Sequence, residues 1–476
     1  MYLERMASVG LIIGAMACLG FFLILVWIHG ISLHYLILVA AAVGMALGIR
    51  LPAHYQVNAV LLLFSSALAV YAAEAVLVYS SIGLNAVEGA GWLNFPQDAT
   101  ARVGAERLHL EKKKNKTFDA RTRLEVVQEL RARGVRAYPD VFPAVLFTAG
   151  SEYTIKSIFQ SQLGEFLPLG GIANATTVFC NESGEYIVYE SDEHGFHNPS
   201  GLWEDKPVEI VALGDSYAHG VCVASDKGFV AVIRAHYPKT INLGINGDGP
   251  LAMLATLKEY GPSLKPSVVL WFYYEGNDLR DLDGREKNSP LLMKYLTSVF
   301  SQELLQRQDE IDRSLRNYLE AAMTTARPAP SLGSIAKLQS LRQSVRTLFE
   351  RRPSREGVSA ELIDYLTHSG APAASEDLVL FQDILAEAQR ASSQWGGKMM
   401  FIYLPTWERY RFPELASKDR VAVLSMARDL HLPVIDIHSV FAEHPDPLTL
   451  FPSRRFAHYN EDGHKLVGAE VVKHLR

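Results

Sequence analysis

The sequence predicts an α/β domain with a parallel sheet between two layers of helices, preceded by a strongly apolar N-terminal region. Short β-branched and aromatic runs such as 208–213 and 268–272 alternate with segments of helical period such as 381–392. Strands that alternate with helices in this way form parallel sheets covered on both faces. The apolar residues that raise the mean hydropathy to +0.06 gather in residues 1–80.

Three apolar runs, 8–27, 31–49 and 57–79, follow one another in this N-terminal region. Each has close to the ~20 residues that a helix needs to cross a bilayer. A cleaved signal peptide has a shorter apolar core and would account for one run only. We therefore predict that residues 1–80 are a membrane anchor of three transmembrane helices, with the lipid bilayer as a partner.

The few cations around these runs predict the orientation of the anchor. Arg5 precedes the first run, Arg50 lies between the second and the third, and the next cation after them is Arg102. Because positively charged loops stay in the cytoplasm, the N-terminus and Arg50 are expected inside the cell. The chain after Ser80 is then expected on the extracytoplasmic side of the cell (inner) membrane.

Charge and cysteine content exclude some functions and leave one question open. A net charge of −6 with 21% charged residues gives no basic field for nucleic acid. Cys180 and Cys222 are the only cysteines outside the apolar runs, and their spacing is not that of a metal site. They are either a disulfide, which an extracytoplasmic location permits, or two buried thiols. No phosphate loop, dinucleotide fingerprint or metal motif is present, so no cofactor is expected.

The part after the anchor divides at residue 207. Residues 81–207 are predicted to form a connector and a cap or lead-in subdomain, in which Asp119 caps a helix that ends at Gly134. Residues 208–476 form the α/β domain. Within this domain the polar, helix-rich stretch 289–352 is predicted to be a helical insertion between two strands.

A candidate nucleophile follows the first strand of the α/β domain. Ser216 lies in Leu213-Gly-Asp-Ser-Tyr-Ala-His-Gly220, directly after the run 208–213. A serine that leaves a strand sharply presents its hydroxyl to solvent, and its own N–H can help to bind an oxyanion. Gly214 permits the tight turn that this geometry needs.

Three further loops follow later elements of the same domain. The segment 242–248 follows the second strand, Gly276-Asn277-Asp278 follows the third, and 458–463 precedes the last helix. Loops at the carboxyl ends of parallel strands gather along one edge, where ligands bind. Together they can present a serine, a backbone N–H and an amide side chain to one carbonyl group.

In this order the blocks resemble those of the SGNH/GDSL hydrolase superfamily, which carry Ser, Gly, Asn and His. The resemblance covers residues 208–476 without the insertion and implies a flavodoxin-like α/β/α fold. It implies that Ser216 attacks an ester and that His458 accepts its proton. The Ser216 N–H, the Gly247 N–H and the Asn277 side chain would then hold the oxyanion.

The sequence departs from the family pattern around the histidine. The family usually has an aspartate three residues before it, and this chain has Arg455 there. Such an acid would orient the imidazole and stabilise its cation. The site is therefore either a Ser–His dyad oriented by a backbone carbonyl or one with another acid, for which Asp462 and Asp436 are the candidates. His464 is the rival base, although a surface position on the last helix is the simpler expectation for it.

These features predict a membrane-anchored serine esterase or acyl-transfer enzyme. It would act on O-acetyl or other acyl esters of an extracytoplasmic envelope glycan or lipid, with a membrane-bound acyl-transfer protein as a further partner. The alternative that Arg455 motivates is a non-catalytic binding or assembly component of a polysaccharide-modification machinery with the same fold.

Overall fold

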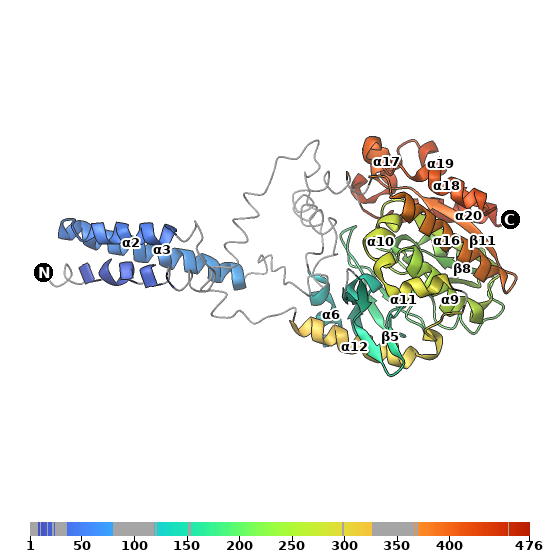
Figure 1. Ribbon diagram of the computed structural model, residues 1–476, viewed down its shortest axis with the longest axis horizontal. Coiled ribbons are helices and arrows are strands. Elements are labelled where there is room, and N and C mark those ends of the chain that lie inside the picture. The colour runs from blue at the N-terminus through green and yellow to red at the C-terminus, as the bar shows by residue number, and fades with distance from the viewer. Residues whose placement is uncertain are drawn as a thin grey trace. The chain divides into compact units, whose positions relative to one another are not determined.

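The computed structural model describes most of the chain, in two compact units. The described residues are 8–9, 11–16, 18–20, 23, 36–79, 119, 121–150, 154–297, 299–325, 367, 370–455 and 457–476. One unit comprises 1–85 and 328–351, and the other comprises 86–327 and 352–476. All site residues predicted from the sequence lie in the second unit. Figure 1 shows the helices and strands of both units.

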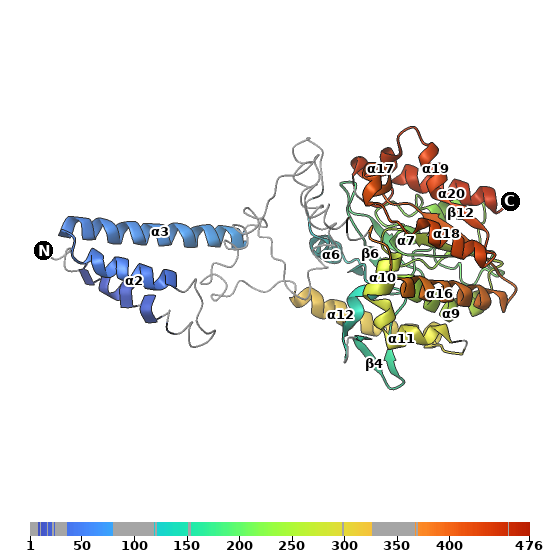
Figure 2. The ribbon, with the colours of Figure 1, turned by 45° about the horizontal axis from the view of Figure 1, so that its top comes forward.

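In the N-terminal unit the helices α2 (Leu36–Gly48) and α3 (Ala53–Tyr79) lie side by side (Figure 2). The Gln56 side chain closes the turn between them by donating to the Ile49 and Leu51 carbonyls at 2.7 and 2.8 Å. Across the described residues, no helix has the combined length and apolarity that crossing a membrane requires. The prediction of three transmembrane helices is therefore not supported, and the run 8–27 lies partly outside the described residues.

The larger unit is built on a five-stranded sheet in the order β12-β11-β10-β8-β9, and all its neighbouring strands are parallel. In chain order this arrangement is 2-1-3-4-5, that of flavodoxin-like doubly wound folds. It confirms the predicted parallel sheet. The strands are β8 (Ile210–Leu213), β9 (Thr240–Asn242), β10 (Val268–Tyr274), β11 (Lys398–Leu404) and β12 (Val434–Asp436).

Side chains alternate between two hydrophobic cores along each central strand. In β10, Val269 and Trp271 belong to one core, whereas Leu270 and Phe272 belong to the other. Successive residues of a strand point to opposite faces, so a strand that is apolar at every position must be covered on both sides. The sequence pattern of the strands thus dictates the two helical layers.

One helix layer lies over each face of the sheet. The core of the first face contains residues of α9 (Pro250–Leu264), α16 (Ser375–Ser393) and α18 (Arg420–Asp429). The core of the second face contains residues of α8 (Phe229–Arg234), α19 (Ile437–Glu443) and α20 (Glu461–His474). The three-layer α/β/α prediction is confirmed for this unit.

The lead-in segment packs into the first of these cores. Its helix α6 (Arg123–Ala132) is capped by Thr122 in a reciprocal capping box with Glu125, so the predicted cap at Asp119 was wrong. A three-stranded sheet and two hairpins follow. The sheet contains β1 (Ala137–Pro139), β6 (Thr176–Val178) and β7 (Val188–Glu190), and the hairpins pair β2 (Phe147–Ala149) with β3 (Ile155–Ser157) and β4 (Phe159–Ser161) with β5 (Gly164–Phe166). Val127 and Leu169 share a core with Leu254 of α9, so this segment is continuous with the α/β domain.

The predicted insertion contains described helices up to residue 325. These are α11 (Pro290–Met293) and α12 (Gln308–Thr325), and most of the stretch after them lies outside the described residues. The remaining helices are α7 (Ser216–His219), α10 (Asp278–Gly284) and α17 (Glu408–Arg411), with 3-10 turns η2 (Pro143–Leu146), η3 (Glu286–Asn288), η4 (Lys294–Leu296), η5 (Leu304–Gln306), η6 (Pro413–Leu415), η7 (Pro447–Leu450) and η8 (Pro452–Arg454).

Candidate active site

Ser216 begins the short helix α7 directly after the sharp turn that ends β8. The Asp215 side chain caps this helix by accepting the Tyr217 N–H at 2.9 Å. A Cβ on Gly214 would lie 2.7 Å from the Ala218 Cβ, so the turn needs glycine for this close approach. The strand end, the cap and the glycine together place Ser216 at the carboxyl edge of the sheet.

His458 lies against Ser216, as the resemblance implied. Its Nε2 is 2.9 Å from the Ser216 Oγ, although the two residues are far apart in the chain. The histidine lies three residues before α20, whose first turn is capped by the Asn460 side chain accepting the Gly463 N–H at 3.1 Å. A nucleophile and a base at hydrogen-bond distance are the geometric requirement for serine catalysis.

The acid that orients His458 is Glu182, a residue that was not expected from the sequence. One carboxylate oxygen lies 2.9 Å from the His458 Nδ1, and the other accepts the His458 backbone N–H at 3.0 Å. Both the ring and the backbone of the histidine are therefore held by one side chain. Glu182 lies in the loop between β6 and β7, outside the α/β domain as predicted from the sequence.

Neither acid proposed from the sequence fills this position. Asp436 pairs with Arg420 and caps α19 by accepting the His438 N–H at 3.2 Å. Asp462 is exposed in the first turn of α20. The Nδ1 of a histidine ring accommodates one in-plane partner, and Glu182 is in that place. Both predictions were wrong for this reason.

The rival base His464 is buried rather than exposed, which corrects the expectation of a surface histidine. Its exposed fraction is 0%, and its Nδ1 accepts the Phe229 N–H at 3.2 Å. Burial lowers its pKa to about 3, and the nearby His458 acts in the same direction. A neutral histidine locked between α20 and α8 serves the packing of these helices.

The loops that carry Gly247 and Asn277 flank the loop of Ser216. β8 pairs with β9 on one side and with β10 on the other, so the segments after β9 and β10 extend on both sides of Ser216. Gly247 has φ +78°, a conformation that favours glycine, and its carbonyl accepts from Arg285 at 2.7 Å. This is the edge at which the three oxyanion donors were expected.

Asn277 is held by an acid of the helix that follows it. Its Nδ2 donates to the Asp281 Oδ2 at 2.7 Å, which uses one of the two N–H groups of the amide. Burial raises the pKa of Asp215 to about 6, and the hydrogen bond from the Tyr217 N–H acts in the opposite direction. The contact with Asp281 fixes the Asn277 amide at the start of α10.

Glu275, two residues before Asn277, has a structural role. Its side chain is fully buried, accepts the Thr406 N–H at 2.7 Å and is hydrogen-bonded to Tyr403 and Arg409. These contacts join the end of β10 to the chain that follows β11. They fix the loop from which Asn277 projects.

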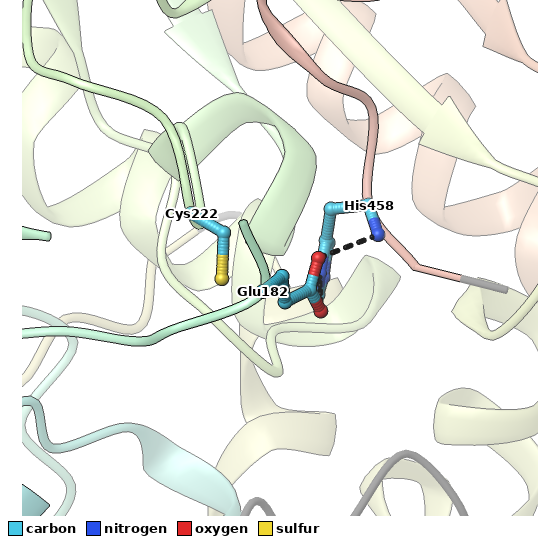
Figure 3. Close-up of side chains that lie close together, drawn as sticks. All are labelled: Glu182, Cys222 and His458. Atoms are coloured by element: carbon cyan, nitrogen blue, oxygen red, sulfur yellow. Dashed lines mark hydrogen bonds and ion pairs between the residues drawn. The ribbon is translucent and has the colours of Figure 1, made fainter. Parts of the chain in front are cut away.

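Cys180 and Cys222 form a disulfide, one of the two states left open by the sequence. Figure 3 shows Cys222 beside Glu182 and His458, and the ligand atoms of these three residues lie within 4.8 Å of one another. No other cluster with metal-ligand spacing occurs among the described residues. Because a metal binds the thiolate form of cysteine, the sulfur of a disulfide does not fit that role.

A hollow of about 490 Å³ lies next to the predicted oxyanion residues. Strands β2 and β3 form one wall, and α10 with Arg285 forms the other. Asp281 and Arg285 line this hollow and also bind Asn277 and the Gly247 carbonyl. The hollow and the two loops therefore share these side chains.

Among the comparisons with known proteins, the one with solved structures finds similar chains. No family model matches the chain, and no curated protein does. The chain is similar to a lipolytic protein of the G-D-S-L family from Desulfitobacterium hafniense, at 13% identity over 56% of this chain and 98% of that one, with a TM-score of 0.30. It is similar to a lipase/acylhydrolase from Enterococcus faecalis, at 14% identity over 56% and 95%, with a TM-score of 0.29.

A third similar structure is a two-domain esterase active on acetylated mannans, at 12% identity over 58% of this chain and 50% of that one, with a TM-score of 0.28. What this chain can do is therefore argued from its own geometry, which is the parallel sheet order and the Ser216–His458 contact.

Proposed function

We propose that the chain is a serine esterase or acyl-transfer enzyme that works through an acyl-Ser216 intermediate. The main support is the chain of hydrogen bonds from Glu182 through the His458 ring to the Ser216 Oγ. The distances from Glu182 Oε1 to His458 Nδ1 and from His458 Nε2 to Ser216 Oγ are both 2.9 Å. A nucleophile, a base and an acid that holds the base are the elements of acyl transfer by serine.

In the first half-reaction the Ser216 Oγ forms a bond to the ester carbonyl carbon while His458 Nε2 takes the hydroxyl proton. The negative charge moves to the carbonyl oxygen, where the N–H groups of Ser216 and Gly247 and the Asn277 amide stabilise it. The bond to the leaving alkoxide then breaks, and His458 returns the proton to that oxygen. Glu182 stabilises the imidazolium during both transfers.

In the second half-reaction an acceptor hydroxyl attacks the acyl-serine by the same route. Water as acceptor releases a carboxylic acid, and a sugar hydroxyl gives a new ester. We propose O-acetyl or other acyl esters of an envelope glycan or lipid as substrate.

The contact between Glu182 and His458 removes the reason for the non-catalytic alternative. It rested on Arg455 standing where an orienting acid was expected. Glu182 supplies that acid from another segment, and the Arg455 backbone N–H donates to the Pro452 carbonyl at 3.1 Å. A chain that had lost its chemistry would have no need of a Ser–His–Glu line.

We further propose that the N-terminal unit attaches the enzyme to a membrane, with the larger unit outside the cytoplasm. Large apolar side chains are exposed on its helices, with Leu47 at 58%, Leu61 at 57% and Leu62 at 69%. Exposed apolar groups in such number need a lipid or protein cover. The Cys180–Cys222 disulfide supports an oxidising compartment. A membrane-bound acyl donor protein is the partner that transferase activity would require.

The decisive experiment combines turnover of an acetyl ester with labelling by a fluorophosphonate probe. Ser216→Ala and His458→Ala are expected to lose turnover, and Ser216→Ala to lose labelling as well. Ser267→Ala and His236→Ala change the same residue types at exposed positions and serve as matched controls. Labelling of Ser216→Ala at the wild-type rate, or turnover by both site variants, would overturn the proposal.

The proposed location has an independent test. A C-terminal reporter that is active only outside the cytoplasm should give signal in cells that carry the full chain. The same fusion with a reporter that works only in the cytoplasm should stay silent. The opposite pattern would place the α/β domain inside and remove the proposed envelope substrates.

A further inference from the structure

The Cys180–Cys222 disulfide joins the segment of the orienting acid to the segment of the nucleophile. Cys180 lies two residues before Glu182, and Cys222 lies three residues after the end of α7, which begins with Ser216. The Cys222 Sγ is within 4.8 Å of both the Glu182 carboxylate and the His458 ring (Figure 3). The disulfide therefore lies next to the Glu182 carboxylate and connects its loop to the segment that follows α7.

Other contacts fix the body of the β6–β7 hairpin. The backbone pair of Phe179 with Ile187 continues the strand ladder. Tyr189 reaches α7 through its hydroxyl, 2.9 Å from the His219 Nε2. Phe179 and Tyr189 also pack against Val221 in a small buried cluster. The hairpin is thus expected to stay folded and docked without the disulfide.

The loop that carries Glu182 is also hydrogen-bonded within itself and to Asp119. The Gly184 N–H donates to the Asn181 side chain, and this side chain donates to the Asp119 carbonyl, both at 2.9 Å. Neither bond reaches the segment of Ser216. Besides the contacts of Glu182 with His458, the disulfide links this part of the loop covalently to the nucleophile segment.

We propose that the Cys180–Cys222 disulfide is a positioning element for catalysis, which holds the Glu182 carboxylate on His458. The proposal rests on the proposed function. A dithiol reductant would convert the disulfide to two thiols with two electrons and two protons, and would itself become a cyclic disulfide. The loop could then shift, and a displacement of about 1 Å at such a contact costs on the order of 10²-fold in rate.

The test is a double-mutant cycle in the full-length chain with an acetyl ester as substrate. Cys180→Ala/Cys222→Ala is expected to lower kcat by about 10²-fold with little change in KM. Glu182→Gln is expected to lower kcat by about 10³-fold in the wild-type background and by only about tenfold in the cysteine-free one. This non-additivity is the mark of residues that act through one contact.

Two controls separate positioning from folding and from general thiol effects. Cys18→Ala removes the free cysteine and should keep wild-type kcat. If the double cysteine variant does not fold, the folded wild-type enzyme is treated with dithiothreitol, and kcat is compared before and after re-oxidation. Circular dichroism shows in each case whether the fold is retained.

Wild-type kcat in the folded cysteine-free enzyme, or an unchanged 10³-fold effect of Glu182→Gln within it, would overturn the inference and leave the proposed function standing. An enzyme in which Ser216→Ala turns over the ester like the wild type would overturn the proposed function instead. The two failures are therefore distinguishable in one set of measurements.

Discussion

Replacing Glu182 with glutamine is the most direct test of the hydrogen bonds that connect Glu182, His458 and Ser216. The carboxylate is 15% exposed and the His458 side chain 20%, so the pair is partly screened by water. Unit charges about 4 Å apart near a protein surface interact by about 4 kcal/mol. Loss of this term when the imidazolium forms would lower kcat by roughly 10³-fold, because each 1.36 kcal/mol is a factor of ten.

Glutamine also changes the proton position on the ring. Its NH₂ group can donate to the His458 Nδ1, which favours the tautomer with the proton on Nε2. In that tautomer Nε2 cannot accept the Ser216 proton, so the loss can approach the ~10⁴-fold typical of such a change. Glu182→Ala removes the charge without offering a donor. We therefore expect a smaller loss of kcat for alanine than for glutamine.

The assay is steady-state turnover of an acetyl ester, with kcat and KM determined separately. Glu185→Gln makes the same chemical change at an exposed position in the same hairpin loop and should keep wild-type kcat. Glu182→Gln with kcat within threefold of wild type would refute the reasoning. An effect confined to KM would do so as well, because the carboxylate is held by the histidine and not by the substrate.

Three further variants probe the rest of the site. Asn277→Ala should lower kcat about 10²- to 10³-fold through the lost oxyanion donor, whereas Asn288→Ala should not; equal kcat values in steady-state turnover would contradict this role. Gly214→Ala would place a Cβ 2.7 Å from the Ala218 Cβ and so displace the turn that carries Ser216. Labelling by the fluorophosphonate should therefore be slower than in the wild type, and an unchanged labelling rate would contradict the packing argument. Burial lowers the pKa of His464 in the folded protein to about 3, so below pH 6.5 a proton binds this histidine in the unfolded chain first. The contribution of neutral His464 to the free energy of unfolding is therefore full above pH 6.5 and is lost as the pH falls towards 3. From pH 7 to pH 5 this histidine should account for about 2 kcal/mol of lost unfolding free energy, and urea unfolding of His464→Asn should show a correspondingly flatter pH dependence.

The fold and the position of Ser216 could be predicted because their signals are local, whereas the role of His458 was predicted only from the family resemblance. A strand that is apolar at every position, such as β10, indicates by itself that both faces of its sheet are covered. The glycine turn before Ser216 follows its strand directly in the sequence. Parallel topology then brings the loops after β8, β9 and β10 to one edge without any knowledge of long-range contacts.

The orienting acid could not be predicted in this way. Glu182 lies in a hairpin loop of a different sheet, and its direct neighbours Asn181 and Ser183 are typical of a solvated loop. Its role arises from the docking of that hairpin on α7, which is a tertiary property. The cysteine two residues earlier was the available signal, since a disulfide to Cys222 would have drawn this loop to the segment after Ser216.

The burial of His464 had a clearer signal in the sequence. His464, Val467 and Val471 recur at spacings of three and four, which places them on one face of a helix. Val467 and Val471 are both fully buried, and His464 shares their environment. The polar side chain suggested a surface position, but the period of the helix was the stronger evidence.

The lead-in segment is therefore a part of the catalytic unit and not a detachable cap. The Asn198 side chain pairs with the backbone of Asn242 in both directions at 2.8 Å, so it binds β9 as a further strand would. Trp203 and Val127 lie in the same core as the sheet. A chain that began at residue 208 would retain Ser216 and His458, yet it would expose one face of its core and lose Glu182. In this molecule the chemistry predicted for residues 208–476 is completed by the residues that precede them.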